Sequence, residues 1–281
     1  MVYKSRRPPV RDAIHFHALP LAGIDAMSAA TARAFPRHTH DQYGIGVVDA
    51  GGHASWSGRG QVEAGPGYFI SVNPGEVHDG RAIGGRPRAW RILYFDPAVM
   101  ADLRADIVAG AHDSFTFTAP VFADRGLHQL FEAAFQYARP QQGASMPSSM
   151  PCETAILRLL ARLGAHSTAR PRRDEAPTAC IRHARSRIDA DPAAPVTLIE
   201  LAKESGLSRY QLIRAFAREL GLTPHAYILQ RRIALAQRLI RAGCDLADVA
   251  VRAGFYDQSH LTRWFVRQFG VTPSHYAVVA R

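Results

Sequence analysis

The chain has 281 residues, of which 47% are hydrophobic and 21% charged, and its formal net charge is +10 at pH 7. This length suits two domains that each bury a core, and this composition excludes disordered and fibrous proteins. No run of about 18 apolar residues occurs, and no apolar segment follows the basic N-terminus, so we expect neither a membrane-spanning helix nor a secretory signal.

The cysteines also bear on the compartment. Cys152, Cys180 and Cys244 lie far apart, are odd in number and have no metal-ligand spacing. This pattern argues against a disulfide framework and against a zinc site of cysteines. We therefore expect a cytoplasmic protein.

The positive charge is concentrated toward the C-terminus. From residue 176 onward, 15 Arg or Lys side chains stand against 8 Asp or Glu, and almost all of the cations are arginines. The guanidinium group binds phosphates and guanine edges in a bidentate fashion. The surplus indicates a polyanion as the partner of this part, although an arginine-rich composition could also reflect codon usage.

The first predicted elements are short strands between residues 32 and 96. Apolar runs such as YGIGVV, GYFISV and RAWRILYF alternate with turn signals such as DAGG, SGRG and NPGE. This pattern predicts an antiparallel sheet that closes into a small barrel or jelly roll. Within the last run, Trp90, Ile92 and Tyr94 are predicted to share one face.

Three histidines fall in this region. His38 and His40 are two residues apart near the start of a strand, so they would project to the same face, and His78 follows the NPGE turn. In a small barrel the three could meet in one interior pocket, where they could bind a small effector, hold a metal, or simply be partly buried strand residues. The aromatic residues that could form pocket walls or belong to the core are Tyr43, Trp56, Trp90 and Tyr94.

Helical periodicity begins after residue 96. Residues 97–110, 126–138 and 152–166 have apolar side chains at three- and four-residue spacings and are expected to pack outside the barrel. The third segment could instead pair two protomers. Residues 167–178 are rich in proline, charge and small side chains and are predicted to link domain 1–166 to domain 179–281.

The C-terminal region contains a duplication. LAKESGLSRYQLIRAFARELGLTPHAY, from Leu201, aligns with VAVRAGFYDQSHLTRWFVRQFGVTPSHY, from Val249. Each copy predicts a helix, a glycine turn and a second helix that begins at a polar N-cap, Ser208 or Asp257. The predicted buried stripes are Leu212, Ala215 and Phe216 in the first copy and Leu261, Trp264 and Phe265 in the second. The predicted DNA-facing residues are Arg209, Tyr210, Ile213, Arg214, Gln258, Ser259, His260, Thr262 and Arg263.

One long helix is predicted between the copies, over residues 225–243. About 18 residues span roughly 27 Å in a helix, and major grooves recur roughly every 34 Å along one face of DNA. Such a spacer could hold two recognition helices near successive grooves, although helical hairpins with glycine turns also occur in domains that bind no DNA.

These motifs resemble a known family. LAxxxGLSxxxLxRxF, from Leu201, and DVAxxxGFxDxSxLxRxF, from Asp248, are similar to the AraC/XylS class of bacterial transcription regulators. Members of the family often carry a polar residue at the position of Ile213. Isoleucine cannot hydrogen-bond a base edge, so the contact expected of Ile213 is an apolar one with the methyl group of thymine. The resemblance implies DNA contacts by Tyr210, Arg214, Gln258, Ser259, Thr262 and Arg263.

The stretch from residue 32 to 95 resembles the cupin-type sensor domain of the same family. Metal-dependent cupin enzymes usually add a glutamate after the histidine pair, whereas DQYGI contains none. We therefore expect no metal cofactor and no catalysis, with His38, His40 and His78 as an alternative metal set. The effector-binding residues are then predicted to be His38, His40, Tyr43, Trp56, His78 and Tyr94.

The resemblance thus implies an α+β protein of two domains, an antiparallel cupin-like β-barrel with flanking helices and an all-α domain of two helix-turn-helix units. Its expected partners are double-stranded DNA, a small-molecule effector, a second copy of the chain and RNA polymerase. Whether it would activate or repress is not encoded in these patterns. Two alternatives stay open: a metal-dependent cupin enzyme with an accessory DNA-binding domain, and a constitutive regulator without an effector.

Overall fold

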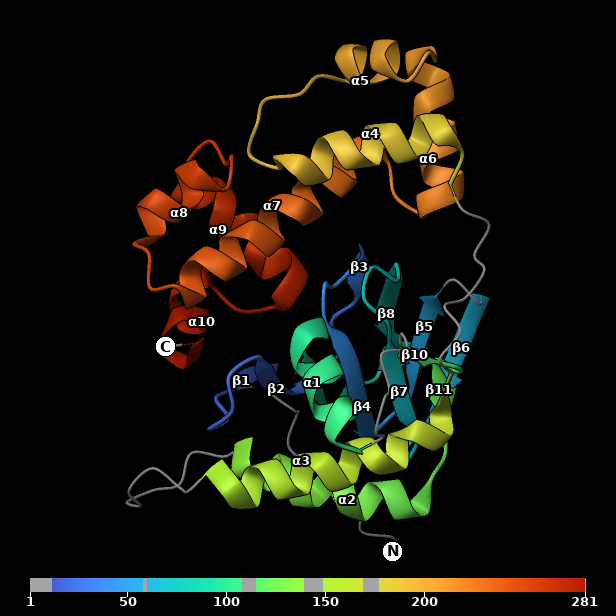
Figure 1. Cartoon of the computed structure of the whole chain (residues 1–281), viewed down its shortest axis with the longest axis vertical. Helices are drawn as coiled ribbons and strands as arrows, with labels where there is room; N and C mark the ends of the chain where they lie inside the picture. Colours follow the sequence, from blue (N-terminus) through green and yellow to red (C-terminus); the bar gives the residue numbers. More distant parts are fainter. Residues whose placement is uncertain (1–11, 58–59, 108–114, 139–148, 169–176, 281) are drawn as a thin grey trace, which may run out of the picture.

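A sandwich of two antiparallel sheets forms the N-terminal domain of the computed structural model (Figure 1). The structure describes residues 12–57, 60–107, 115–138, 149–168 and 177–280. The six-stranded sheet has the order β1 (Ala13–His17), β2 (Ile24–Thr31), β9 (Arg88–Phe95), β4 (Tyr43–Ala50), β7 (Phe69–Val72) and β11 (Val121–Phe122).

The second sheet and a short ladder complete the strands. Four strands lie in the order β3 (Phe35–His38), β8 (His78–Ala82), β5 (His53–Ser57) and β6 (Gly60–Ala64). A separate pair joins β10 (Thr116–Phe117) to β12 (Ser167–Thr168). The predicted antiparallel jelly roll is confirmed.

Two strands begin earlier in the chain than predicted. The sequence placed the sheet between residues 32 and 96, but β1 and β2 precede it and pair with each other from Ala13↔Ala30 onward. Their sequences, AIHFH and IDAMSAAT, contain alanine, serine and histidine where a strand usually carries large apolar side chains. Their alternation is therefore a weak signal.

Strand alternation divides the sandwich into an outer and an inner core. On β9, Leu93 and Phe95 pack into the outer core beneath the flanking helices, whereas Trp90, Ile92 and Tyr94 point between the sheets. The predicted common face of Trp90, Ile92 and Tyr94 is confirmed.

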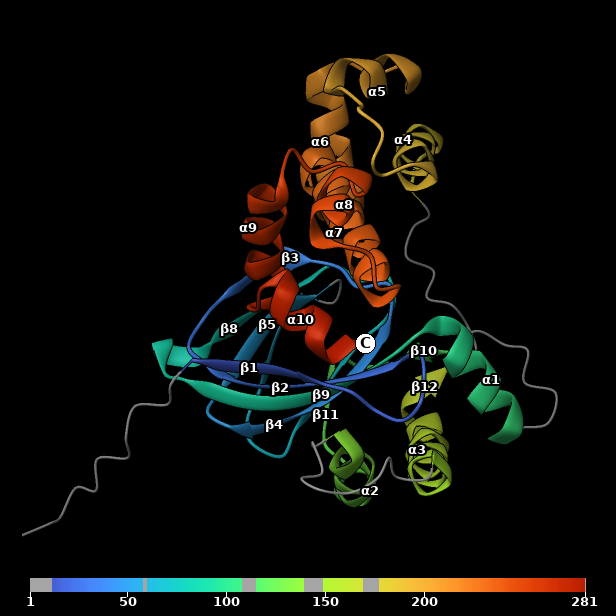
Figure 2. The same cartoon turned by 90° about the vertical axis from the view of Figure 1, so that its left-hand side faces the viewer.

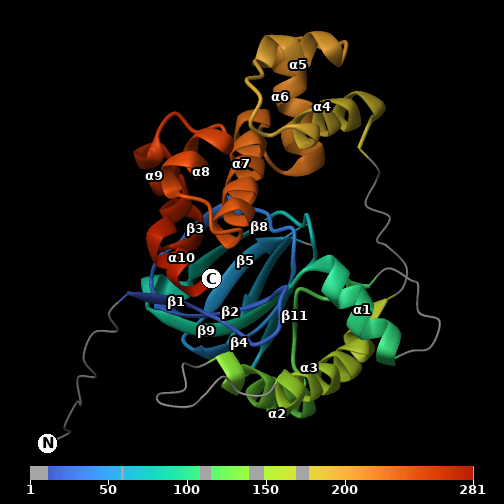
Figure 3. The same cartoon turned by 60° about the vertical axis from the view of Figure 1, so that its left-hand side comes forward.

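The flanking helices cover the outer face of the six-stranded sheet (Figure 3). Phe131 and Leu159 of this layer pack with Phe69 of the sheet in one buried core. The third helix packs its apolar face in this core, as expected if it covers the barrel. The alternative that it pairs two protomers stays a prediction. The helices are α1 (Pro97–Ile107), α2 (Arg125–Phe135) and α3 (Ser149–Leu163), with short 3-10 turns at Ile83–Gly85, Gln136–Ala138 and Gly164–His166.

The C-terminal domain is entirely helical in its described residues. The predicted connecting helix is present as α7 (Pro224–Arg241), capped by the Thr223 hydroxyl, which accepts from the Ala226 amide. Most of the predicted linker, residues 169–176, lies outside the described residues, so its boundaries stay a prediction. The helices are α4 (Ala179–Ala190), α5 (Leu198–Glu204), α6 (Arg209–Leu220), α7 (Pro224–Arg241), α8 (Leu246–Arg252), α9 (Gln258–Phe269) and α10 (Pro273–Ala280).

None of the helices in the described part of the chain is long and apolar enough to cross a membrane.

The second helical unit packs directly on the sandwich (Figure 2). Phe16 of β1 meets Phe269 and Tyr276 edge to face, with ring centroids 6.1 and 5.1 Å apart. Arg33 donates to the Val266 carbonyl at 2.8 Å. These contacts merge the core of the second unit with the inner core of the sandwich.

Candidate DNA interface and effector pocket

Both second helices of the duplicated units begin at the predicted caps. The Ser208 hydroxyl accepts from the Gln211 amide at 3.2 Å, and the Gln211 side chain accepts from the Ser208 amide at 2.9 Å. The Asp257 carboxylate accepts from the His260 amide at 2.6 Å. Because these bonds satisfy amides of the first turn, α6 and α9 each start at a defined residue.

The N-terminal halves of these helices expose polar side chains. Leu212 and Phe216 of α6, and Leu261 and Phe265 of α9, are buried as predicted. Ala215 and Trp264 are partly buried. The predicted contact residues that lie exposed are Arg209, Tyr210, Arg214, Gln258, Ser259 and Arg263.

The other three predicted contact residues are partly buried. Ile213 lies in an apolar cleft beside Val196 and Ile228, and Thr262 is half-covered. His260 accepts a hydrogen bond from the Trp264 indole at 3.0 Å and meets the Phe255 ring. These contacts occupy Ile213 and His260 within their own domain, so both are less available to DNA than the sequence suggested.

The C-terminal ends of both helices face the sandwich. Gly221 ends α6 in the left-handed conformation, where an added Cβ would lie 3.3 Å from Val77 of the β7–β8 turn. Gly270 ends α9 in the same way against Ile14 and Phe35. The opposite ends, which carry the exposed residues, therefore point away from the sandwich (Figure 2).

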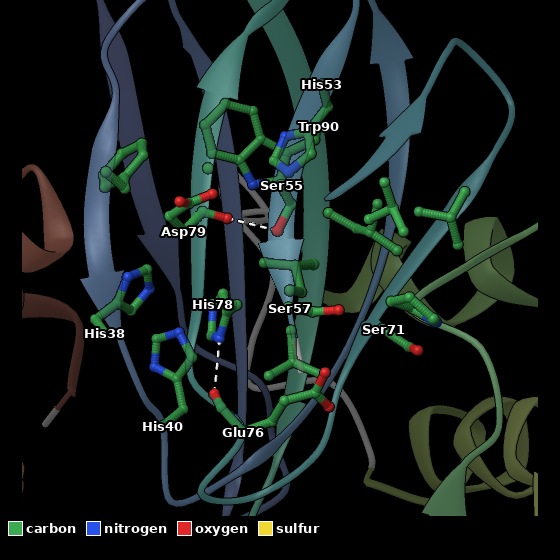
Figure 4. Close-up of a pocket in the computed structure, with 18 of the residues that line it drawn as sticks. His38, His40, His53, Ser55, Ser57, Ser71, Glu76, His78, Asp79 and Trp90 are labelled. Atoms are coloured by element: carbon green, nitrogen blue, oxygen red, sulfur yellow. Dashed lines mark hydrogen bonds between the residues drawn. The ribbon is translucent and has the colours of Figure 1, made fainter. Parts of the chain in front are cut away.

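A pocket of about 90 Å³ lies between the two sheets (Figure 4). Gln268 and Phe269 of α9 also line it, so it borders the recognition helix of the second unit. Its sandwich lining includes Met27, Ile70, Trp90, Ile92 and Tyr94 from one sheet and Phe35, His38, His53, Ser55, Ser57 and His78 from the other, with His40 beside them.

The three histidines found in the sequence meet in this pocket. His38 on β3 is paired directly with His78 on β8, and His40 follows β3. Their ring nitrogens include one set in which all three lie within 4.8 Å of one another. The expected convergence is therefore present in the structure.

Hydrogen bonds define the tautomers of two of these rings. His38 Nδ1–H donates to the Pro36 carbonyl at 2.7 Å, and His78 Nδ1–H donates to the Glu76 carbonyl at 3.0 Å. A carbonyl only accepts, so Nδ1 carries the proton. Burial lowers the pKa of His38 to about 3 and that of His78 to about 4, which leaves both rings neutral at pH 7 with an Nε2 lone pair.

Among the polar residues of the pocket that the sequence did not identify are Arg88 and His53. Arg88 is 1% exposed, and its Nε donates to His53 Nδ1 at 3.0 Å and its Nη1 to the Arg33 carbonyl at 3.1 Å. Nη2 meets no acceptor in the described part of the chain. Burial lowers the pKa of Arg88 to about 10, so it remains a cation. Arg88 lies two residues before Trp90 on β9, so strand alternation places both side chains on the same face. This signal in the sequence could have identified Arg88.

Two predicted effector residues lie outside the pocket. Tyr43 packs in the outer core and donates to the Phe115 carbonyl at 2.8 Å, because the positions of β4 that face Ile92 and Tyr94 are glycines, Gly44 and Gly46.

Trp56 is the second. It lies beneath the Arg37 guanidinium, 4.0 Å from the ring centroid, while its neighbours Ser55 and Ser57 on β5 point inward. Alternation along the strand thus excludes the tryptophan from the pocket.

Ion pairs connect the rim of the pocket to α7. Asp41 directly follows His40, and its carboxylate lies 2.5 Å from Arg231 and 3.6 Å from Arg238. Asp25 pairs with Arg241, the last residue of the same helix. The long helix between the two recognition units is therefore held to the sandwich beside the histidines.

Comparison with known proteins agrees with this architecture. Residues 21–160 match the model of the AraC-like ligand binding domain, and residues 201–277 match a helix-turn-helix domain model. The uncharacterized HTH-type transcriptional regulator YbfI of Bacillus subtilis is 28% identical over 234 residues, 81% of either chain.

Two further likenesses differ in their extent. The virulence regulon transcriptional activator VirF of Yersinia enterocolitica is 37% identical over 78 residues, which are 27% of this chain and 29% of VirF. The structure of unsaturated fatty acid bound ToxT from Vibrio cholerae covers 97% of both chains with a TM-score of 0.54 and 12% identity, a likeness of fold. Two family matches, the relatives and the fold lead to one conclusion: the chain belongs to the AraC-type transcription regulators and joins an AraC-like ligand-binding domain to a DNA-binding helix-turn-helix domain.

Proposed function

We propose that this chain works in the cytoplasm as a promoter-binding regulator rather than an enzyme, that it reads DNA with α6 and α9, and that a small effector bound between the sheets controls it. The observation that carries the DNA-binding part is the pair of capped helices whose exposed N-terminal halves point away from the sandwich. Polar and cationic side chains at such ends are the groups that enter a major groove.

The contact residues proposed are the exposed ones. Arg214 and Arg263 take equivalent places in the two helices, and a guanidinium there can bind guanine or phosphate. Tyr210, Gln258 and Ser259 would flank them. We further propose a homodimer on paired sites and contact with RNA polymerase, in line with the likeness to a transcriptional activator.

The effector part rests on where the pocket lies. A molecule held between the sheets would touch Phe269 and Gln268 of α9 and approach the loop of Asp41, which pairs with α7. An effector that binds the docked and released arrangements of the DNA-binding domain with different affinities would shift the balance between them. The free Nη2 donor of buried Arg88 favours an effector with an acidic or other acceptor group.

A gel shift tests the DNA-binding proposal. The full-length protein is titrated on the intergenic DNA upstream of its own gene and on unrelated DNA of equal length, over a series of salt concentrations. We expect preferential binding to the upstream DNA that persists near physiological salt. Equal binding to both, lost steeply as salt rises, would show only nonspecific attraction of charge and would contradict specific recognition of this DNA.

A further inference from the structure

We propose that His38, His40 and His78 form a binding site for one divalent transition-metal ion, which they hold through ring nitrogens in the pocket between the sheets. The three rings come from β3, the residues just after it and β8, and they face one another in Figure 4. Ring centroids are 4.3 Å apart for His38 and His78, 4.8 Å for His38 and His40, and 5.0 Å for His40 and His78.

The hydrogen bonds prepare two of the rings as ligands. Because Nδ1 of His38 and of His78 donates to a backbone carbonyl, Nε2 of each ring carries the lone pair that a metal needs. A carbonyl behind the distal nitrogen is the usual arrangement that orients a metal-binding imidazole. The His40 backbone carbonyl accepts from the Gly75 amide at 2.8 Å, but its ring makes no hydrogen bond within the described residues, so either ring nitrogen is available.

The spacing needs little adjustment. Zinc binds histidine nitrogen at about 2.0–2.1 Å, so tetrahedral ligands lie about 3.3 Å from one another. The ligand atoms here lie within 4.8 Å of one another. The ligand atoms would have to move closer on binding, and His40 is the ring that can turn, since it lies outside the regular strand and its ring makes no hydrogen bond within the described residues.

A cation would also give these rings a common partner on the side that faces the pocket. His38 is buried, and His40 and His78 are partly buried. Within the described residues the hydrogen bonds of the His38 and His78 rings are those of Nδ1, which leave Nε2 of each ring turned to the other histidines. One shared cation would bind all three rings at once.

The donor set decides the class of ion. Three neutral imidazoles suit zinc, cobalt, nickel, iron or copper and not magnesium or calcium, which prefer oxygen ligands. The glutamate that metal-dependent cupin enzymes usually add is not required, since three histidines alone form a known zinc site with an open position. Here the open position would face the pocket. Glu76 is not one of the residues whose ligand atoms converge, and its Oε2 accepts from the backbone and side-chain amides of Asn73.

His53 provides a matched control within the pocket. Its ring is buried, and burial lowers its pKa to about 3, so it is neutral at pH 7 as the His38 and His78 rings are. However, Nδ1 accepts from Arg88, so Nε2 carries the proton and presents a donor instead of a lone pair. A histidine of this tautomer is not available as a ligand through Nε2.

Metal analysis tests the site. The full-length protein, made without a histidine tag, is stripped with a chelator, given one equivalent of Zn²⁺ or Co²⁺ and desalted before elemental analysis. We expect one ion per chain, visible cobalt bands of low coordination number, and a higher melting temperature with Zn²⁺. His40→Gln, which breaks no hydrogen bond of the fold, should weaken binding by about 100-fold or more, since even changes behind a ligand cost 10–100-fold.

Two further variants and one control complete the experiment. His38→Gln and His78→Gln should lose the ion as His40→Gln does, and His53→Gln should retain it, with circular dichroism of the metal-free proteins as the check on folding. A parent protein that retains no ion after desalting overturns the proposal. So does a folded His40→Gln protein that still binds one ion per chain as tightly as the parent.

Discussion

Arg214 and Arg263 illustrate how single residues carry the proposed recognition. Each is the sixth residue of its helix, each is exposed, and each lies beside a buried stripe that orients it outward. Arg218 and Arg267 lie one turn further toward the sandwich. The two pairs thus offer the same charge at different distances from the exposed end.

Alanine at Arg214 or Arg263 is therefore expected to weaken specific DNA binding by about 1–3 kcal/mol, since a bidentate contact to a base is lost. Arg218→Ala and Arg267→Ala remove the same charge and should change specific binding much less. Gel-shift titrations with specific and unrelated DNA measure both. If Arg218→Ala and Arg267→Ala weakened specific binding as much as Arg214→Ala and Arg263→Ala, the charge of these arginines and not their position would account for binding.

The pocket histidines make stability depend on pH. Burial holds the pKa of His53 near 3, below its ordinary 6.5. The unfolded chain therefore binds a proton that the folded chain rejects, and stability falls as pH falls below 6.5. From pH 7 to 5 a histidine of this kind removes about 2 kcal/mol. Urea unfolding in the presence of a chelator should show this decrease, and a shallower one in His53→Gln. An unchanged free energy of unfolding across this range would contradict it.

At the scale of elements, the two helix-turn-helix units differ in their attachment. Of the sandwich residues that the structure describes, only Val77 belongs to the core of the first unit, around Phe216, whereas the core of the second, around Phe265, continues into Phe16 and Trp90. The second unit is thus part of the sandwich core, and the first is joined to it mainly through α7.

Phe265→Ala should therefore destabilise more than the second helical unit. Removal of this fully buried ring is expected to cost about 3–5 kcal/mol of unfolding free energy, since it leaves a cavity in a shared core. Val251→Ala on neighbouring α8, which is 72% exposed, is the control and should cost less than 1 kcal/mol or so. Chemical denaturation measures both, and similar values for the two variants would refute the shared core.

At the scale of the molecule, Asp41 links the pocket to the DNA-binding domain. Its partners Arg231 and Arg238 lie on α7, which joins both recognition units. The pairs are partly exposed, so their contribution is small, about 1 kcal/mol or less. A weak link of this kind is suited to an arrangement that an effector must shift.

Asp41→Asn should raise amide hydrogen exchange in α7 by up to about fivefold, since about 1 kcal/mol of holding energy is removed. Asp49→Asn is the matched control, because Asp49 pairs with Arg91 within the sandwich. Exchange followed by mass spectrometry compares the two. Identical exchange in α7 for both variants would contradict a role for Asp41 in docking.

The sequence by itself determined the duplicated helical units, their caps at Ser208 and Asp257, and the long α7, because periodicity and capping depend on residues within a few turns of one another. It also singled out His38, His40 and His78. Only the tertiary structure decided that Tyr43 and Trp56 lie outside the pocket.

Both faces of these strands are covered, so alternation alone does not say which face of a strand turns inward, and only the structure placed His53 on the inner face. The docking of α9 on the sandwich likewise could not be predicted from local sequence patterns. It depends on contacts such as that between Arg33 and Val266, which lie 233 residues apart in the chain and meet only when both cores have formed.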